Sequence, residues 1–304
     1  MRLFYGEEVQ RALDRRAPLV ALETSVVAQG LPPPHNLHAA RACEEAVRRA
    51  GAVPAALAVI DGQVKVGLSA PELERLAAGG ERVMKIGSRD LAPALAGLRT
   101  GGTTVSASME IAARAGIRVF ATGGIGGVHR GVAETLDVSQ DLLALSKFPV
   151  AVVCAGAKSV LDLPKTLEAL EALSVPVVGV GTHDFPSFFC RTSGLALEQR
   201  VEGPEDAARL LSIRFGELQQ GGVVLALPPP ADTALPSLEL EKHMHAALAE
   251  ADARDVRGKA LTPFLLSELS RRSGGRTLKA NLALLEHNAA FAGQLAVACA
   301  ALSG

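Results

Sequence analysis

The chain has 304 residues, of which 48% are hydrophobic and 21% charged, so it lacks the low apolar content that marks disordered chains. Its 31 Lys and Arg against 32 Asp and Glu leave a formal charge of -1, so no overall field attracts nucleic acid or an anionic membrane. Only 3% of residues are aromatic and none is Trp, which argues against a stacking platform for single-stranded nucleic acid.

We expect neither a membrane span nor an export signal in this sequence. A bilayer-spanning helix needs roughly 18 consecutive apolar residues, and the longest apolar run, Phe148 to Ala157, is far shorter. Residues 1 to 10 carry charges where a secretory signal would be apolar, so we expect a cytoplasmic protein. The four cysteines, Cys43, Cys154, Cys190 and Cys299, have no zinc-ligand spacing and are interpreted as buried thiols in a reducing compartment.

Short apolar runs predict strands that are buried on both faces. In chain order these are Leu19 to Leu22, Val53 to Ile60, Val119 to Ala121, Val150 to Cys154, Val175 to Val180 and Val223 to Leu227.

Segments with helical periodicity alternate with these strands. They are Ala39 to Ala50, Pro71 to Ala78, Leu167 to Leu173, Pro204 to Gln219, Leu238 to Arg254 and Leu278 to Leu302. The alternation predicts an α/β fold of three layers, with helices on both faces of a largely parallel, mixed sheet. The proline triplets Pro32 to Pro34 and Pro228 to Pro230 are interpreted as stiff turns rather than domain joints, so residues 1 to 304 are expected to form a single domain.

In such folds ligands bind beyond the carboxyl ends of the strands, so polar residues that directly follow apolar runs are candidates for the site. Glu23 follows the first predicted strand, next to Thr24 and Ser25. A carboxyl beside apolar residues can serve as a proton donor. The alternative is a structural Glu paired with a nearby Arg.

Two further segments combine cations, hydroxyls and glycines, as a phosphate site does. They are Val83 to Arg89, which contains Lys85, and Arg99 to Ser106, which contains Thr104 and Val105. Surface loops use the same residue types, so each segment alone also fits a loop.

A glycine-rich loop, Ala121 to Gly131, follows the predicted strand Val119 to Ala121 and contains His129. Its glycines allow backbone N–H groups to approach an anion, but it matches neither a dinucleotide-binding fingerprint nor a P-loop. A turn without a ligand is the alternative.

Asp137, Ser139 and Asp141 alternate at a period of two, which in an extended segment places all three on one side. Their oxygens suit a hard divalent ion such as Mg²⁺ or Mn²⁺. The alternative is that they cap the helix expected at Leu142 to Ser146.

Lys158 follows the predicted strand Val150 to Cys154 after a turn of small residues, which delivers its amine to the ligand-binding edge of the sheet. A desolvated lysine can attack a carbonyl carbon and form a Schiff base. A lysine that caps a helix or extends into solvent is the other interpretation.

The ordered set of these segments resembles the pseudouridine-5′-phosphate glycosidase family, also known as indigoidine synthase A-like proteins, from about Leu19 to Leu302. The segments that carry the resemblance are Ala21 to Ser25, Gly30 to Asn36, Lys85, Gly101 to Ser108, Ala121 to Arg130, Asp137 to Asp141, Cys154 to Ser159 and Phe188 to Ser193.

The resemblance implies reversible cleavage of pseudouridine 5′-phosphate at its C–C glycosidic bond, giving uracil and ribose 5-phosphate. It implies Lys158 as the nucleophile that forms an imine with the ring-opened sugar, Glu23 as the proton donor, and Asp137 as the ligand of one Mn²⁺ per subunit. The residues that it implies in substrate binding are Lys85, Thr104, Val105, His129, Ser139, Gln140, Asp141 and Asn281. It also implies a homotrimer.

The chemistry explains this combination of residues. A C–C glycosidic bond offers no heteroatom leaving group to protonate, so the two-carboxylate scheme of ordinary glycosidases does not transfer. A lysine amine that opens the ribose ring supplies an iminium at C1 as electron sink while uracil C5 is protonated. Two rivals remain open at this point: hydrolysis of an N-glycosidic bond by metal-activated water, with Lys158 holding only phosphate, and a non-catalytic sugar-phosphate binding protein.

Overall fold

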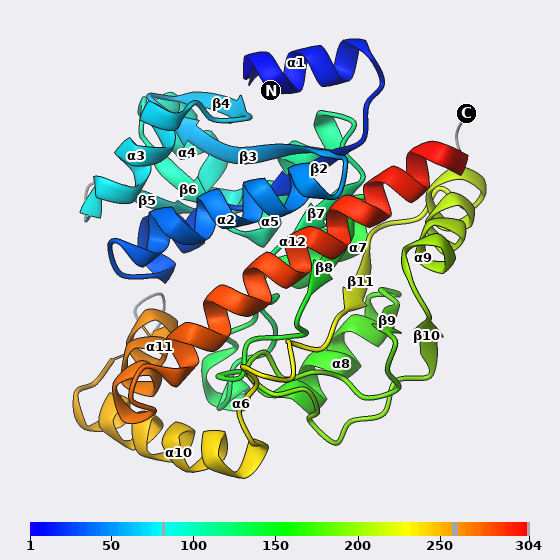
Figure 1. The fold of residues 1–304 in the computed structure, drawn as a ribbon. Helices are drawn as coiled ribbons and strands as arrows, with labels where there is room; N and C mark the ends of the chain where they lie inside the picture. Colours follow the sequence, from blue (N-terminus) through cyan, green and yellow to red (C-terminus); the bar gives the residue numbers. More distant parts are fainter. Residues whose placement is uncertain (81–82, 257–260, 303–304) are drawn as a thin grey trace.

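The computed structural model describes residues 1–80, 83–256 and 261–302. Within these ranges the strands form one sheet in the order β1-β4-β3-β2-β7-β8-β11-β9-β10, and a short β5–β6 pair joins at β3 (Figure 1). Their bounds are β1 Leu3–Tyr5, β2 Leu19–Leu22, β3 Val53–Ile60, β4 Gln63–Val66, β5 Met84–Ile86, β6 Gly101–Thr103, β7 Val119–Ala121, β8 Ala151–Cys154, β9 Val177–Val180, β10 Gln199–Val201 and β11 Val223–Ala226.

Strand β3 connects a parallel and an antiparallel part of the sheet. Its first half pairs with β2 in parallel, and its second half pairs with β4 and β6 in the antiparallel sense. From β3 through β2, β7, β8, β11 and β9 to β10 every pairing is parallel. The predicted class, a largely parallel but mixed sheet, is therefore confirmed.

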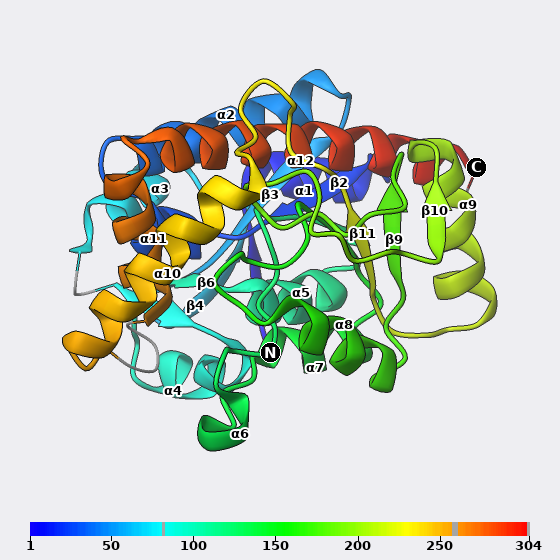
Figure 2. The same ribbon diagram turned by 90° about the horizontal axis from the view of Figure 1, so that it is seen from below.

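The helices lie on both faces of the sheet, as Figure 2 shows from below the view of Figure 1. The larger helices are α1 Glu7–Asp14, α2 His35–Arg49, α3 Ala70–Ala78, α5 Val105–Arg114, α7 Gln140–Lys147, α8 Leu163–Ala172, α9 Pro204–Leu211, α10 Ser237–Ala253, α11 Leu261–Arg272 and α12 Arg276–Leu302. Shorter turns are η1 Val26–Gly30, η3 Ser88–Asp90, α4 Leu91–Ala96, α6 Val132–Thr135 and η4 Ser212–Glu217. Helices α2, α9 and α12 form one layer, and α5, α7 and α8 form the other.

Local sequence explains where several helices begin. The Ser69 hydroxyl accepts from the Glu72 N–H at 3.5 Å while the Glu72 carboxylate accepts from the Ser69 N–H at 2.9 Å, a reciprocal cap that starts α3. Asp162 caps α8 with a single bond, in which Oδ1 accepts from the Lys165 N–H at 3.2 Å.

Helix α12 crosses the sheet beside α2 and contacts β2, β7 and β8 (Figure 1). Gly293 makes the close approach of the two helices possible, because a Cβ there would lie 2.6 Å from the Ala50 Cβ. The largest fully buried side chains include Phe120, Phe185 and Phe189, and most buried apolar residues belong to one core cluster. Every helix in the described ranges is too short or too polar to cross a bilayer.

The structure departs from the predicted elements in three instructive places. Strand β4 was not predicted, although Asp61 and Gly62, both with positive φ, form the tight turn of a β3–β4 hairpin. The helix predicted over Pro204 to Gln219 is divided, because α9 ends at Leu211 and the wider turn η4 follows. Helix α7 begins at Gln140, two residues before the predicted start, which changes the environment of Asp141.

Candidate active site

The register of three neighbouring strands places the key side chains together. Leu22 of β2 pairs with Ala121 of β7, and Ala121 pairs with Val153 of β8. The chain therefore leaves these strands at one edge of the sheet, where Glu23 and Thr122 each come one residue beyond a paired position. Because parallel strands end at the same edge, residues far apart in sequence meet there.

A cleft of about 560 Å³ opens at this edge. Four of the residues predicted for the site line it, namely Glu23, Lys85, Lys158 and Asn281. They come from the turn after β2, from β5, from the turn after β8 and from α12. The remaining lining residues are Ser25, Val26, Gln29, Gly30, Thr122, Gly123, Gly124, Phe188, Leu266 and Leu285.

Two hydroxyl groups hold the Glu23 carboxylate. The Thr122 hydroxyl donates to Oε1 and the Ser25 hydroxyl donates to Oε2, so each carboxylate oxygen has its own donor. In the described part of the chain no Arg or Lys pairs with Glu23, so the predicted alternative of a structural Glu–Arg pair is wrong. Glu23 is half-buried, with its carboxylate at the cleft.

The turn before Lys158 needs a glycine. Gly156 has a φ of +77°, and a Cβ there would lie 2.0 Å from the carbonyl oxygen of Pro186. The Lys158 N–H then donates to the Ile125 carbonyl at 3.1 Å, which joins the lysine turn to the glycine-rich loop after β7. Close packing of backbone against backbone thus fixes the position from which the lysine side chain leaves.

The Lys158 side chain is half-buried in the cleft, where Phe188, Leu266 and Leu285 supply apolar walls. Among the residues that the structure describes, its amine takes part in no hydrogen bond or ion pair. The N-cap of the next helix, α8, is Asp162, so the alternative of a helix-capping lysine is wrong, whereas a lysine that extends toward solvent stays the other interpretation.

His129 lies beside the predicted metal ligand, Asp137. Its Nδ1 is 3.9 Å from Oδ2 of Asp137. Burial lowers the pKa of His129 below 6.5, Asp137 opposes this shift, and the cations Lys158 and Lys85 reinforce it. The direction of this shift favours the neutral imidazole.

The segment from Asp137 to Asp141 is not extended throughout, so the prediction that Asp137, Ser139 and Asp141 share one side is wrong. Ser139 is the N-cap of α7, and its hydroxyl accepts from the Asp141 N–H at 3.2 Å. The alternative prediction of a helix cap is confirmed for Ser139. Asp141 lies within the first turn of the helix and is buried, whereas the Asp137 side chain is 42% exposed.

The Asp141 carboxylate joins two backbone segments. Oδ1 accepts from the Ser106 N–H at 2.9 Å, and Oδ2 accepts from the Gly126 N–H at 2.8 Å. Ser106 lies in the first turn of α5, and Gly126 lies in the glycine-rich loop. Asp141 therefore fixes the start of a helix relative to the loop that leads to His129.

The two segments predicted to resemble a phosphate site meet beside Asp141. Lys85 of β5 pairs with Gly102 of β6, and the Thr104 N–H donates to the Ile86 carbonyl at 2.9 Å. Thr104 is the N-cap of α5 and Val105 is its first residue, so backbone N–H groups and the positive end of the helix dipole gather there.

Gln140 and Ser106 tie the neighbouring loop to this helix start. The Gln140 Oε1 accepts from the Arg89 N–H at 3.0 Å, and the Ser106 hydroxyl accepts from the Ser88 N–H at 3.3 Å. The arrangement of cation, hydroxyls and helix N-terminus suits a phosphate group.

The donor set around Asp137 fits only a largely hydrated metal ion. In the described ranges no three His, Cys, Asp or Glu side chains gather as metal ligands. Asp137 offers one partly exposed carboxylate, and His129 lies beside it. Mg²⁺ and Mn²⁺ accept such sites, because they bind one or two carboxylates and keep several waters.

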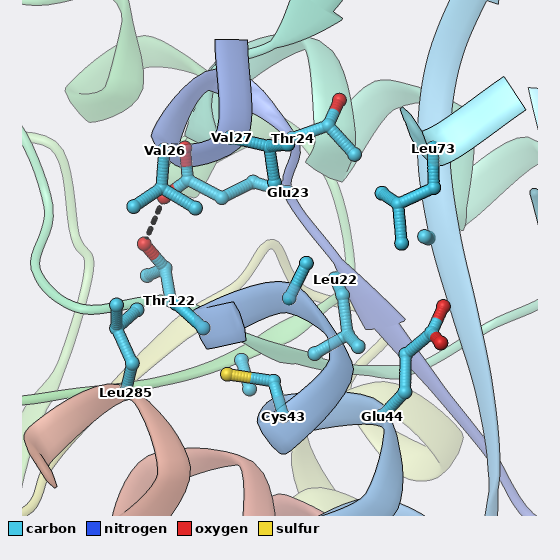
Figure 3. Close-up of a pocket in the computed structure, with 14 residues that line it drawn as sticks. Leu22, Glu23, Thr24, Val26, Val27, Cys43, Glu44, Leu73, Thr122 and Leu285 are labelled. Carbon is cyan, nitrogen blue, oxygen red and sulfur yellow. Dashed lines mark hydrogen bonds between the residues drawn. The ribbon is translucent and has the colours of Figure 1, made fainter. Parts of the chain in front are cut away.

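A second, apolar pocket of about 460 Å³ lies behind Glu23 (Figure 3). Leu22, Val27, Leu73 and Leu285 contribute aliphatic walls. Burial raises the pKa of Cys43, which also lines this pocket, to about 12, so the thiol stays protonated and unreactive. Glu23 thus lines both the cleft that holds Lys158 and this apolar pocket.

Sequence reasoning missed several cleft residues. Thr122 directly follows the predicted strand Val119 to Ala121, so its place at a strand end was a usable signal. Phe188 belongs to a segment that carries the family resemblance, but its place in the cleft was not predicted, and no local pattern points to Leu266 of α11. Phe188 has a φ of +59°, an uncommon backbone conformation for a bulky residue and one that only the structure shows.

Comparisons with known proteins agree with this architecture. Residues 8–298 match the family model described as indigoidine synthase A like protein. The chain is 65% identical over 303 residues to the pseudouridine-5′-phosphate glycosidase of Myxococcus xanthus, with 100% of both chains covered. It is 48% identical to the protein of that name from Caldanaerobacter subterraneus, over 96% of this chain and 95% of the relative.

Two crystal structures share the fold. The prealnumycin C-glycosynthase AlnA in complex with ribulose 5-phosphate superposes with a TM-score of 0.91 at 39% identity, covering 99% of this chain and 98% of that one. An indigoidine synthase A-like protein from Thermotoga maritima superposes with a TM-score of 0.87 at 36% identity, covering 97% and 95%.

Proposed function

Since the chain belongs to the indigoidine synthase A-like family, we propose that the cleft between Glu23 and Lys158 carries out the reaction for which its relatives are named. The enzyme is a lyase-type glycosidase that cleaves the C–C glycosidic bond of pseudouridine 5′-phosphate, giving uracil and ribose 5-phosphate. The observation that supports this site for the reaction is the position of one unpaired amine and one carboxylate in a single cleft beside a helix N-terminus.

Lys158 is proposed as the nucleophile. Its Nζ bonds to C1 of the ribose as the C1–O4 bond breaks, and O4 leaves with the electron pair and takes a proton from solvent. The glycosidic bond between ribose C1 and uracil C5 then breaks, and its electron pair stays with uracil. The lone pair of the Lys158 nitrogen forms the iminium at C1. Water hydrolyses the iminium, which releases ribose 5-phosphate and restores the amine.

Glu23 is proposed to move the proton that uracil C5 needs. Positioned acid–base catalysis contributes roughly 10²–10⁴-fold to a rate. The carboxylate is the acidic group that lines the cleft together with the lysine in the described part of the chain, and no Arg or Lys there neutralises it.

The substrate phosphate is proposed to bind at Lys85, Thr104 and Val105. Support comes from the helix start at Val105 and from the pairing of β5 with β6 beside it. Gln140 and Asp141 hold the surrounding loops, and Ser139 caps α7 at the same place. His129 and Asn281 are proposed to contact the sugar and the base, because the charge of Lys158 acts on His129 and because Asn281 lines the cleft.

Asp137 is proposed to hold one Mn²⁺ through its exposed carboxylate, with waters as most of the other ligands. Such an ion, when bound, polarises nearby oxygens and orients the substrate. The covalent bond to the sugar is formed by the lysine of this chain, and the proton for uracil is moved by its carboxylate.

Imine formation can be tested by trapping. Incubation with ribose 5-phosphate and borohydride should add to Lys158 the mass of the sugar phosphate less one oxygen atom. Lys158→Ala should gain no adduct and release no uracil, whereas Lys165→Ala, which removes an exposed amine paired with Asp162, should behave as the wild type. An active wild type without an adduct would favour hydrolysis by activated water, and binding without turnover would favour a simple binding protein.

A homotrimer and a cytoplasmic location complete the proposal. Light scattering should then give three times the chain mass of 31.4 kDa. The cytoplasm is proposed because the substrate is a phosphorylated nucleoside, which does not cross membranes unaided.

A further inference from the structure

Each oxygen of the Glu23 carboxylate accepts a hydrogen bond from a hydroxyl, one from Thr122 and one from Ser25. We infer that Thr122 and Ser25 are positioning residues, which hold the Glu23 carboxylate aimed into the cleft, so that Glu23 enters the reaction as a proton acceptor. This inference rests on the proposed function and deepens it, since it assigns the order in which the carboxylate gains and gives its proton.

Hydroxyl groups that donate to a carboxylate stabilise its charged form. The surroundings of Glu23 make these donors important, because an apolar pocket lined by Leu22, Val27 and Leu285 lies directly behind it (Figure 3). A carboxylate at such a boundary loses solvation on one side, and hydrogen-bond donors have to replace it. In the described part of the chain, the two hydroxyls are its side-chain donors.

The backbone holds the Thr122 hydroxyl in place. The Thr122 N–H donates to the Val153 carbonyl at 3.1 Å, which continues the β7–β8 pairing by one residue. From the other side, Nδ2 of Asn288 on α12 donates to the Thr122 carbonyl at 2.8 Å. Thr122 is 2% exposed and Asn288 is fully buried, so neither side chain is free to turn into solvent.

This arrangement accounts for the protons of the proposed reaction. As the Nζ–C1 bond forms, the nitrogen of Lys158 loses one proton, and the ionised Glu23 accepts it. Glu23 then gives this proton to uracil C5 as the C1–C5 bond breaks, and the carboxylate returns to its starting state. The hydroxyls of Thr122 and Ser25 remain intact throughout.

The test is the pH dependence of uracil release. In Thr122→Val the shape of the side chain is kept and the hydroxyl is lost, so the acid limb of the kcat profile should move to higher pH by about one unit. At pH values on the acid limb, uracil release by Thr122→Val should then be about tenfold slower than by the wild type. Thr122→Ser keeps the donor and should restore the wild-type limb, and Ser25→Ala should shift the limb in the same direction.

Thr24→Val is the matched control. Thr24 is adjacent to Glu23 and buried, but its hydroxyl donates to the Leu57 carbonyl at 2.6 Å rather than to Glu23. Its loss should lower stability and leave the acid limb in place. An unshifted limb in both Thr122→Val and Ser25→Ala, or an equal shift in Thr24→Val, would overturn the inference.

Two safeguards keep the outcomes separate. If Thr122→Val does not fold, the partly exposed Ser25 carries the test through Ser25→Ala. A wild type that releases no uracil at any pH would contradict the proposed function itself, whereas an active wild type with unshifted variants contradicts only the role of the two hydroxyls.

Discussion

Oδ1 of Asp141 accepts a hydrogen bond of 2.9 Å from the backbone N–H of Ser106, and this bond fixes the start of α5 against the glycine-rich loop. The same carboxylate holds the Gly126 N–H with its other oxygen, so one side chain sets the shape of the proposed phosphate site. A buried acceptor of this kind is costly to remove because the N–H groups lose their partner.

Asp141→Asn should weaken substrate binding. The amide has only one acceptor oxygen, so one of the two N–H groups loses its partner, which costs about 1–3 kcal/mol of folding free energy. We expect KM for pseudouridine 5′-phosphate to rise about tenfold with a smaller change in kcat. Asp206→Asn is the control, since its carboxylate also accepts a backbone N–H, that of Glu202, but at the start of α9. Equal KM changes in both variants would contradict the prediction.

Gly156→Ala should damage both stability and catalysis. Its Cβ would lie 2.0 Å from the Pro186 carbonyl oxygen, and its φ of +77° is unfavourable for alanine. Strain and overlap together should cost about 3–5 kcal/mol. Displacement of the lysine turn should also abolish borohydride trapping at Lys158.

Gly194→Ala separates the two effects of the glycine substitution. Gly194 also has a φ of +77°, but nothing lies within 4 Å of its added Cβ. We expect a loss of about 1 kcal/mol from the backbone conformation alone, with trapping unchanged. Chemical denaturation measures the loss of unfolding free energy in both variants. Equal losses would show that the overlap with the Pro186 carbonyl does not destabilise Gly156→Ala.

The pH dependence of stability should report on His129. Burial lowers the pKa of His129 below its ordinary value of 6.5. As pH falls through 6.5, the unfolded chain binds a proton at this residue and the folded protein does not, so the free energy of unfolding decreases. Above pH 6.5 the residue contributes no such dependence. The free energy of unfolding should therefore fall less for His129→Gln than for the wild type when the pH is lowered from about 7.5 to about 5.5. Urea denaturation at these two pH values measures the difference. Parallel curves for the two proteins would contradict this.

The effect of Mn²⁺ on the melting temperature should depend on Asp137. If the proposed Mn²⁺ site is correct, the metal raises the melting temperature of the wild type by binding the folded state, and Asp137→Asn abolishes this rise. The melting temperature is read without substrate, so the result does not depend on activity. Glu134→Gln, which changes an exposed carboxylate on α6, should keep the response to metal. A full response in Asp137→Asn would place the ion elsewhere.

Local sequence patterns determined much of this fold. The strands β2, β3, β7 and β11 lie where runs of buried aliphatic residues predict them, because a strand covered on both faces needs an apolar side chain at nearly every position. Glu23 and Lys158 were identifiable as candidates because each follows such a strand closely, and the resemblance to a family pointed to the same residues.

Tertiary structure decided how these residues act on one another. Thr122 and Glu23 are 99 residues apart, and their hydrogen bond exists only because β7 pairs with β2. The sequence placed Asp141 in an extended segment, on one side with Asp137 and Ser139. Because α7 begins at Gln140 instead of Leu142, the Asp141 carboxylate lies in the first helical turn and accepts from two backbone N–H groups. Side-chain types and local periodicity are properties of short segments, whereas strand order, helix start and the closeness of two backbones arise from packing across the whole chain. The sequence alone therefore named the candidate reacting groups, and only the folded structure showed what holds them.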